Sequence, residues 1–122
     1  MILIVDGHKD IGIALGHLLH HAGFEALAVT SGSEALAKLK VLRPSLVVLD
    51  VNMPEMDGLT VLKTIKEHQE LKDLRVVMFS AESSPETKAE AKRLGAMDYL
   101  SKCSFDFTRV VDRICELAER PA

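Results

Sequence analysis

The chain alternates short apolar runs with longer amphipathic stretches, and it does so five times in 122 residues. The apolar runs are Ile2–Val5, Ala26–Val29, Leu46–Leu49, Arg75–Phe79 and Tyr99–Leu100. The first and third are continuous rather than alternating, which is typical of strands covered on both faces. A repeated strand–helix order with covered strands predicts an α/β fold: a doubly wound parallel sheet with right-handed crossovers.

The stretches between the runs carry apolar residues at the spacing of helices that bury one face. Four helices are expected around residues 11–22, 35–42, 59–65 and 107–117, the second of them ended by Pro44 and capped by Ser31 or Ser33. A further helix, from about Pro85 to Leu94, presents mainly alanines to the sheet. We expect this helix to be held weakly and to be the most mobile one.

Length and composition predict one domain over residues 1–122, with no output domain in the chain. The net charge is −3 and the basic residues are scattered, so we expect no direct binding of nucleic acid. No run approaches the roughly 20 apolar residues of a membrane span, and no signal peptide is evident, so we expect a cytoplasmic protein away from membranes.

Polar residues follow four of the predicted strands: Asp6, Asp50, Ser80 and Lys102. Ligands of open parallel sheets bind at the carboxyl ends of the strands, where the strand order reverses. Each residue taken alone has a simpler explanation, since Asp and Ser often cap helices and Lys is usually solvated. Four separate segments that converge on one edge favour a site instead.

Four segments carry a family resemblance: ILIVD (2–6), VLDVNMPEMDG (48–58), FSA (79–81) and YLSK (99–102). Together they resemble the response-regulator receiver domains of two-component signalling, along essentially the whole chain. The resemblance implies a flavodoxin-like, five-stranded sheet with strand order 2-1-3-4-5. It also implies a signalling switch that accepts a phosphoryl group on Asp50 from a histidine kinase or phosphotransfer protein, and that is not an enzyme beyond its own phosphorylation and dephosphorylation.

The resemblance also assigns roles residue by residue. It implies that Lys102 and Ser80 are the catalytic partners of Asp50, and that Mg²⁺ is bound by Asp6, Asp50 and the Asn52 backbone carbonyl. It implies that Ser80 and Tyr99 are the switch residues and that the Ala81 backbone contacts the phosphoryl group. The residues that tune the lifetime of the phosphoryl group would be Asn52 and Glu82. The chemistry agrees with this assignment, because a carboxylate can attack phosphorus and the reaction mainly needs positioning and charge neutralisation.

Two positions depart from the family pattern. Gly7 stands where a second acid usually ligates Mg²⁺, so we expect Mg²⁺ affinity to fall by at least about 10–100-fold. His8 or Asp10 could compensate in part, although imidazole is a poor Mg²⁺ ligand. Cys103 replaces the usual proline after Lys102, and a cis bond there costs about 2.5–4 kcal/mol, so the sequence leaves cis and trans open.

These departures motivate an alternative function, an atypical receiver that binds partners without phosphorylation. In either case we expect a downstream protein target or a separate output domain, and a possible homodimer through the helix at 85–94, the strand at 99–100 and the last helix. A phosphohydrolase is disfavoured, because Asn52 stands where such enzymes place a second Asp. The cluster of His17, His20 and His21 is interpreted as a solvated helix face that captures metal only adventitiously.

Overall fold

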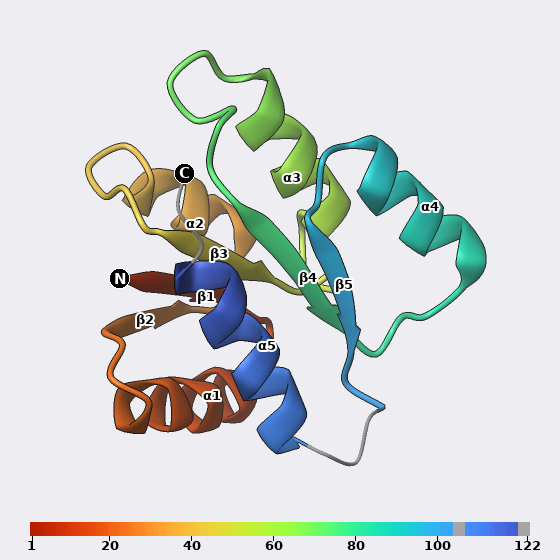
Figure 1. The fold of residues 1–122 in the computed structure, drawn as a ribbon. Helices are drawn as coiled ribbons and strands as arrows, with labels where there is room; N and C mark the ends of the chain where they lie inside the picture. The colour runs from red at the N-terminus through yellow and green to blue at the C-terminus, as the bar shows by residue number, and fades with distance from the viewer. Residues whose placement is uncertain (104–106, 120–122) are drawn as a thin grey trace.

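The computed structural model describes residues 1–103 and 107–119 and contains one five-stranded parallel sheet (Figure 1). Its strands are β1 (Ile2–Val5), β2 (Ala26–Val29), β3 (Leu46–Leu49), β4 (Val76–Ser80) and β5 (Asp98–Ser101). The order across the sheet is β2-β1-β3-β4-β5, and all neighbours pair in parallel. The predicted fold class and strand order are therefore confirmed.

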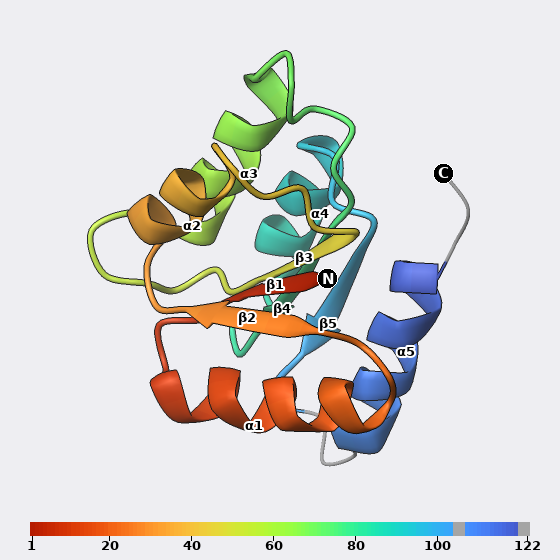
Figure 2. The ribbon, with the colours of Figure 1, turned by 90° about the vertical axis from the view of Figure 1, so that its left-hand side faces the viewer.

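Helices cover both faces of the sheet, as a doubly wound fold requires. The helices are α1 (Lys9–His21), α2 (Gly32–Lys38), α3 (Gly58–Glu67), α4 (Pro85–Arg93) and α5 (Phe107–Glu119). Helices α1 and α5 lie on one face, and α2, α3 and α4 lie on the other (Figures 1 and 2). Among the described residues, no helix is long and apolar enough to cross a membrane.

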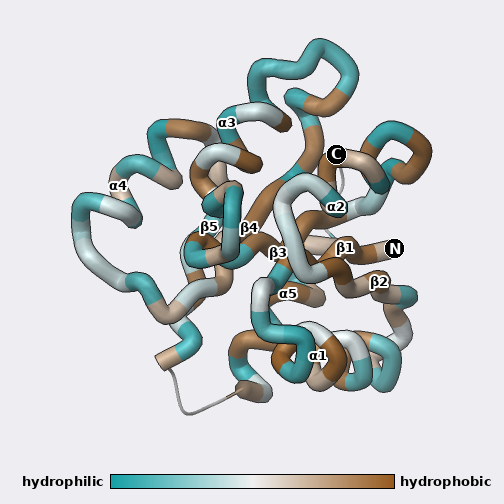
Figure 3. Tube along the Cα trace, turned by 180° about the vertical axis from the view of Figure 1, so that it is seen from behind, coloured by the Kyte–Doolittle hydropathy of each residue, from teal (hydrophilic) through white to brown (hydrophobic). Residues whose placement is uncertain are grey.

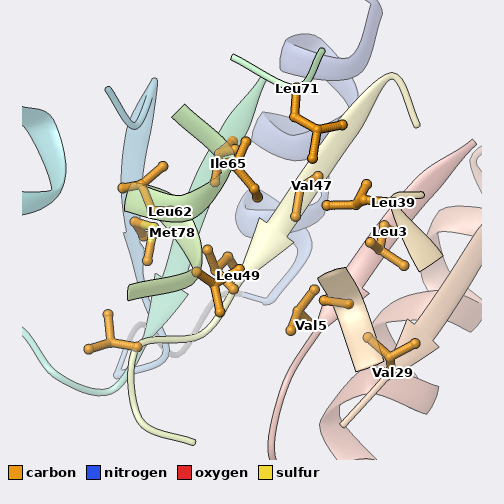
Figure 4. Packing of buried hydrophobic residues seen from close by; sticks show 14 of the residues in the cluster. Leu3, Val5, Val29, Leu39, Val47, Leu49, Leu62, Ile65, Leu71 and Met78 are labelled. Atoms are coloured by element: carbon orange, nitrogen blue, oxygen red, sulfur yellow. The ribbon is translucent and has the colours of Figure 1, made fainter. Parts of the chain in front are cut away.

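The continuous apolar runs feed two separate cores. Along β1, Ile2 and Ile4 pack into the core under α1 and α5, whereas Leu3 and Val5 pack into the core under α2 and α3. Figure 4 shows this second core between the sheet and its helices. All four residues are at most 1% exposed. Because side chains alternate across a strand, a strand buried on both faces needs apolar residues at every position.

Helix α4 has little apolar contact with the sheet. Ala91 is its only buried residue, whereas Ser84 caps it by accepting a hydrogen bond from the Thr87 amide (3.2 Å) and Pro85 occupies its first turn. Figure 3 shows that α4 is mainly hydrophilic, whereas β4 is hydrophobic. The structure thus shows the small apolar contact area that we expected for α4 from the sequence. The mobility of this helix stays a prediction.

Helix α2 is shorter than the sequence indicates, because it ends at Lys38 rather than at Pro44. The amides of Lys40 and Val41 bond to carbonyls three residues back, which is 3₁₀ geometry. The guanidinium of Arg43 then donates hydrogen bonds to two carbonyls of this turn. Orphan carbonyls at a helix end need such partners, so the side chain stabilises an early end that apolar spacing alone does not indicate.

Candidate functional site

The polar strand ends come together at one edge of the sheet. Asp6 and Asp50 directly follow the neighbouring strands β1 and β3, Ser80 is the last residue of β4, and Lys102 directly follows β5. The two carboxylates and the hydroxyl belong to residues that are at most 2% exposed. Burying two acids is costly unless a cation compensates them, so the position of Lys102 decides whether this cluster is tolerable.

Lys102 bridges both carboxylates. Its Nζ atom lies 2.7 Å from Oδ2 of Asp6 and 3.1 Å from Oδ2 of Asp50, and its side chain is only 10% exposed. The same ammonium lies 5.6 Å from the centre of the Phe79 ring, close enough for a cation–π attraction. One ammonium against two carboxylates leaves the pocket with net negative charge, so it still attracts a cation.

Asp50 keeps one oxygen without a hydrogen bond. Its Oδ2 atom is buried and accepts none from the described residues, although the Lys102 ammonium makes a close ionic contact with it. Buried polar atoms are nearly always satisfied, so an orphan in an otherwise well-packed protein calls for a functional explanation. A buried carboxylate oxygen with no hydrogen bond to break is suited to receive an electrophile or to ligate a metal.

A chain of hydrogen bonds connects this pocket to α4. The Ser80 hydroxyl oxygen accepts from the Glu82 amide (3.1 Å), and the Tyr99 hydroxyl donates to the Glu82 carbonyl. Tyr99 is half-buried against the core under α2 and α3, and its burial, ahead of the nearby negative charges, raises the pKa of its phenol. Glu82 thus bonds through its backbone both to Ser80 and to the aromatic side chain on β5.

The Glu82 carboxylate faces α4 rather than the acidic pocket. It accepts hydrogen bonds from the Ser84 amide (3.0 Å) and the Thr87 hydroxyl (3.4 Å), at the start of that helix. These hydrogen bonds, that of the Ser84 amide first, lower the pKa of the carboxyl group. Asn52 and Ala81 also lie outside the ionic cluster and are exposed.

Residues 2–115 match the family model of the response regulator receiver domain. The chain belongs to this receiver family. It is 37% identical over 114 residues to the chemotaxis protein CheY of Bacillus subtilis, a match that covers 93% of this chain and 92% of that protein. The structure of chemotaxis response regulator CheY4 of Vibrio cholerae resembles it with a TM-score of 0.86 at 33% identity, covering 95% and 96% of the two chains.

Other relatives of the receiver domain are much longer. A protein-glutamate methylesterase/protein-glutamine glutaminase of Archaeoglobus fulgidus is 38% identical over 102 residues, which is 83% of this chain but 29% of that protein. The chain likewise spans 30% of a second methylesterase of this kind, from Rhodospirillum rubrum. The resemblance to these proteins therefore concerns the receiver domain and not the remainder of their length.

Gly7 leaves open space beside the acidic pocket of this receiver. A Cβ atom at this position would lie 3.5 Å from side-chain carbons of Met53 and Pro54 and 3.6 Å from the Asn52 carbonyl oxygen, all ordinary contacts. The position therefore accommodates a Cβ atom, next to the Asn52 carbonyl that the resemblance assigns to the metal site. Position 7 therefore lacks a carboxylate, although the space for the first side-chain atom is present.

The receiver domain has a trans bond between Lys102 and Cys103, since no peptide bond within 1–103 or 107–119 is cis. The Lys102 amide donates to the Ser80 carbonyl (2.9 Å), which extends the ladder between β4 and β5 by one bond. That bond directs Lys102 across the edge of the sheet, so its ammonium reaches both carboxylates without proline at the next position.

The pocket suits a divalent cation of the kind that receiver domains bind through acidic residues. Asp6 and Asp50 supply carboxylate oxygens, the preferred ligands of Mg²⁺, and Asp50 has an unbonded one. Together with His8 they form a cluster whose ligand atoms all lie within 4.8 Å of one another. From the sequence we expected His8 only to compensate in part for the acid that is missing at position 7. The signal in the sequence for its place in this cluster is its position two residues after Asp6.

Proposed function

We propose that this receiver domain is a phosphorylation-dependent switch of a two-component system, with Asp50 accepting a phosphoryl group from a histidine kinase or phosphotransfer protein. The buried Oδ2 atom of Asp50 carries the proposal, because it accepts no hydrogen bond from the described residues and lies 3.1 Å from the Lys102 ammonium. Among the described residues this oxygen is held by an ionic contact alone, and the cation of that contact is already in place to offset the incoming negative charge.

In the proposed transfer, an oxygen of Asp50 forms a bond to phosphorus while the phosphorus–nitrogen bond of the donor phosphohistidine breaks. The electron pair of that bond returns to the donor imidazole. Lys102 stays beside the phosphoryl oxygens and offsets their charge, and the amide of Ala81, in the loop after β4, would be a further donor. Mg²⁺ held by Asp6, Asp50 and the Asn52 carbonyl would supply additional charge neutralisation, and we expect weak binding because of Gly7.

The switch is proposed to run through Ser80, Glu82 and Tyr99. A phosphoryl group adds about −1.5 to −2 charges and strong acceptor oxygens, and these compete for the hydroxyl hydrogen of Ser80. Movement of Ser80 would disturb the Glu82 amide that bonds to it and the carbonyl that holds Tyr99. Helix α4 responds readily because Ala91 alone is buried in it.

The readout surface is proposed to be the face formed by α4, β5 and α5. A groove of about 300 Å³ lies between α4 and β5, lined by both lysines of the helix and by Tyr99. A target protein, a separate output domain or a second copy of the chain would bind there. In this proposal residues 1–122 form one signalling domain in the cytoplasm, with no catalytic turnover beyond its own phosphorylation and dephosphorylation.

Intact-protein mass spectrometry after incubation with Mg²⁺ and acetyl phosphate tests the proposal. We expect a mass increase of one phosphoryl group in the wild type and none in Asp50→Asn. Asp57→Asn is a matched control, since Asp57 lies in the same segment but caps α3 through the Thr60 amide. Phosphorylation that persists in Asp50→Asn contradicts the assignment.

The second candidate, an atypical receiver that acts without phosphorylation, is favoured by Gly7 and Cys103. Both lie next to residues of the ionic pocket, Asp6 and Lys102. The same experiment separates the two candidates. An unmodified mass even at high Mg²⁺ concentration favours the atypical receiver.

A further inference from the structure

His8 is held beside the acidic pocket by local geometry. Its amide donates a 2.8 Å hydrogen bond to Oδ1 of Asp6, and its ring Nδ1 atom lies 3.5 Å from the same oxygen. The other carboxylate oxygen of Asp6 contacts Lys102. The backbone bond thus fixes the start of the His8 side chain next to Oδ1 of Asp6, the carboxylate oxygen other than the one that Lys102 contacts.

The imidazole is available to a ligand there. His8 precedes α1 at its N-cap position, but its side chain makes no capping hydrogen bond. The side chain is 69% exposed and is therefore free to change rotamer. Ligand atoms of Asp6, His8 and Asp50 already lie within 4.8 Å of one another, and neighbouring ligands of one ion at about 2.1 Å are separated by about 3 Å.

The surroundings of the Oδ2 atom of Asp50 point independently to a further cation. This atom is buried and accepts no hydrogen bond from the described residues. The Lys102 ammonium, 3.1 Å from this oxygen, is shared with Asp6, so one ammonium faces two carboxylates and a cation held by Asp50, Asp6 and His8 would offset the remaining negative charge.

The donor set then determines which cation is favoured. Two carboxylates with one neutral imidazole form a mixed oxygen–nitrogen site, which is common for first-row transition metals. Mg²⁺ prefers oxygen ligands and gains little from imidazole, and the glycine at position 7 supplies no further oxygen. Affinity for such sites rises from Mn²⁺ through Co²⁺ to Cu²⁺.

We propose that His8 makes the acidic pocket a site for an imidazole-binding divalent transition metal, represented by Co²⁺, in preference to Mg²⁺. The inference concerns the same pocket as the proposed function, but it requires only binding. The ion bound beside Asp50 would then be a transition metal rather than Mg²⁺. The identity of the bound metal would in that case help to regulate this receiver.

Metal titration without any phosphodonor tests the inference. The competing surface ligands are removed first, in a background of His17→Ala, His20→Ala, His21→Ala and Cys103→Ser, all exposed positions. Calorimetry and the visible absorption of Co²⁺ then measure binding of Co²⁺ and Mg²⁺ to this protein and to its His8→Ala, His68→Ala and Asp50→Asn derivatives. His68→Ala is the matched control, an exposed histidine on the opposite side of the sheet.

We expect His8→Ala to weaken Co²⁺ binding at least about tenfold, and to leave Mg²⁺ affinity within about twofold. His68→Ala should change neither, and Asp50→Asn should weaken both. Equal losses for the two metals in His8→Ala, no loss for Co²⁺, or Co²⁺ binding that survives Asp50→Asn would each overturn the inference.

The two proposals fail in different ways. If Asp50 is phosphorylated with Mg²⁺ but His8→Ala leaves Co²⁺ binding unchanged, the metal preference is wrong and the switch stands. If His8 and Asp50 bind Co²⁺ as expected but no phosphate is incorporated with either metal, the switch is wrong and the metal site stands.

Discussion

Nζ of Lys102 lies 3.1 Å from Oδ2 of Asp50, although the two residues follow strands β5 and β3, which β4 separates. The lysine side chain therefore reaches across the end of β4 and lies over the Phe79 ring on its way. This contact joins the far side of the sheet to the strand that carries the acid. The same ion pair therefore belongs to the acidic pocket and connects the ends of strands β5 and β3.

Replacing the lysine and replacing the aspartate of this ion pair should have different effects on the stability of the domain. Lys102→Met is expected to lower the free energy of unfolding by about 3 kcal/mol, because it leaves two buried carboxylates without their cation. Asp50→Asn should match or exceed wild-type stability, since it removes a buried charge with an unbonded oxygen. Urea denaturation measures both, and equal losses would contradict this account of the charge balance.

Gly7→Asp should raise Mg²⁺ affinity by at least about tenfold, because it adds a carboxylate at a position where a Cβ atom makes only ordinary contacts. Calorimetric titration with Mg²⁺ provides the measurement. Gly7→Asn is the control of similar size without charge, and it should tighten binding much less. Unchanged affinity in the aspartate variant would show that the lost acid does not limit Mg²⁺ binding.

Gly58 lies directly against the backbone of Asp50, so we expect its replacement to destabilise the fold strongly. A Cβ atom there would lie 1.9 Å from the Asp50 carbonyl oxygen, a backbone atom that cannot move aside locally. We expect Gly58→Ala to cost about 3 kcal/mol or more in unfolding free energy. Gly16→Ala, within α1, is the matched control: its Cβ atom would meet only Cδ1 of Ile4, at 3.9 Å, so the variant should gain about 0.5–1 kcal/mol. Similar values for the two variants in urea denaturation would refute the steric argument.

Tyr99 provides a pH-dependent signal of its own, because it is the only tyrosine and the chain has no tryptophan. Burial raises the pKa of its phenol, so the folded protein holds this proton more tightly than the unfolded chain does. The resulting stabilisation is complete below the unfolded value of about 10 and is lost as pH rises through the higher folded pKa. Absorbance of tyrosinate should show a native midpoint above that of the urea-unfolded protein; coincident midpoints would contradict it.

Much of this architecture was predictable from short stretches of sequence. The unbroken apolar runs of β1 and β3 indicate strands buried on both faces, and the polar residues that end them lie at one sheet edge in any parallel arrangement. Predictions failed where a distant or flexible side chain decides the outcome. Apolar spacing extended α2 toward Pro44, whereas the Arg43 guanidinium stabilises the earlier end by bonding carbonyl groups.

The amino-acid order alone determined the fold class, the strand order through its family motifs, and the residue types available at the sheet edge, because these depend on local periodicity and on chain connectivity. Tertiary structure decided which atoms meet. It set the trans bond after Lys102, directed the Glu82 carboxylate to α4, and placed the His8 imidazole beside Asp6. The first outcome accompanies a backbone hydrogen bond from Lys102 to Ser80 on the neighbouring strand, and the other two depend on side-chain rotamers; the spacing of apolar residues encodes neither.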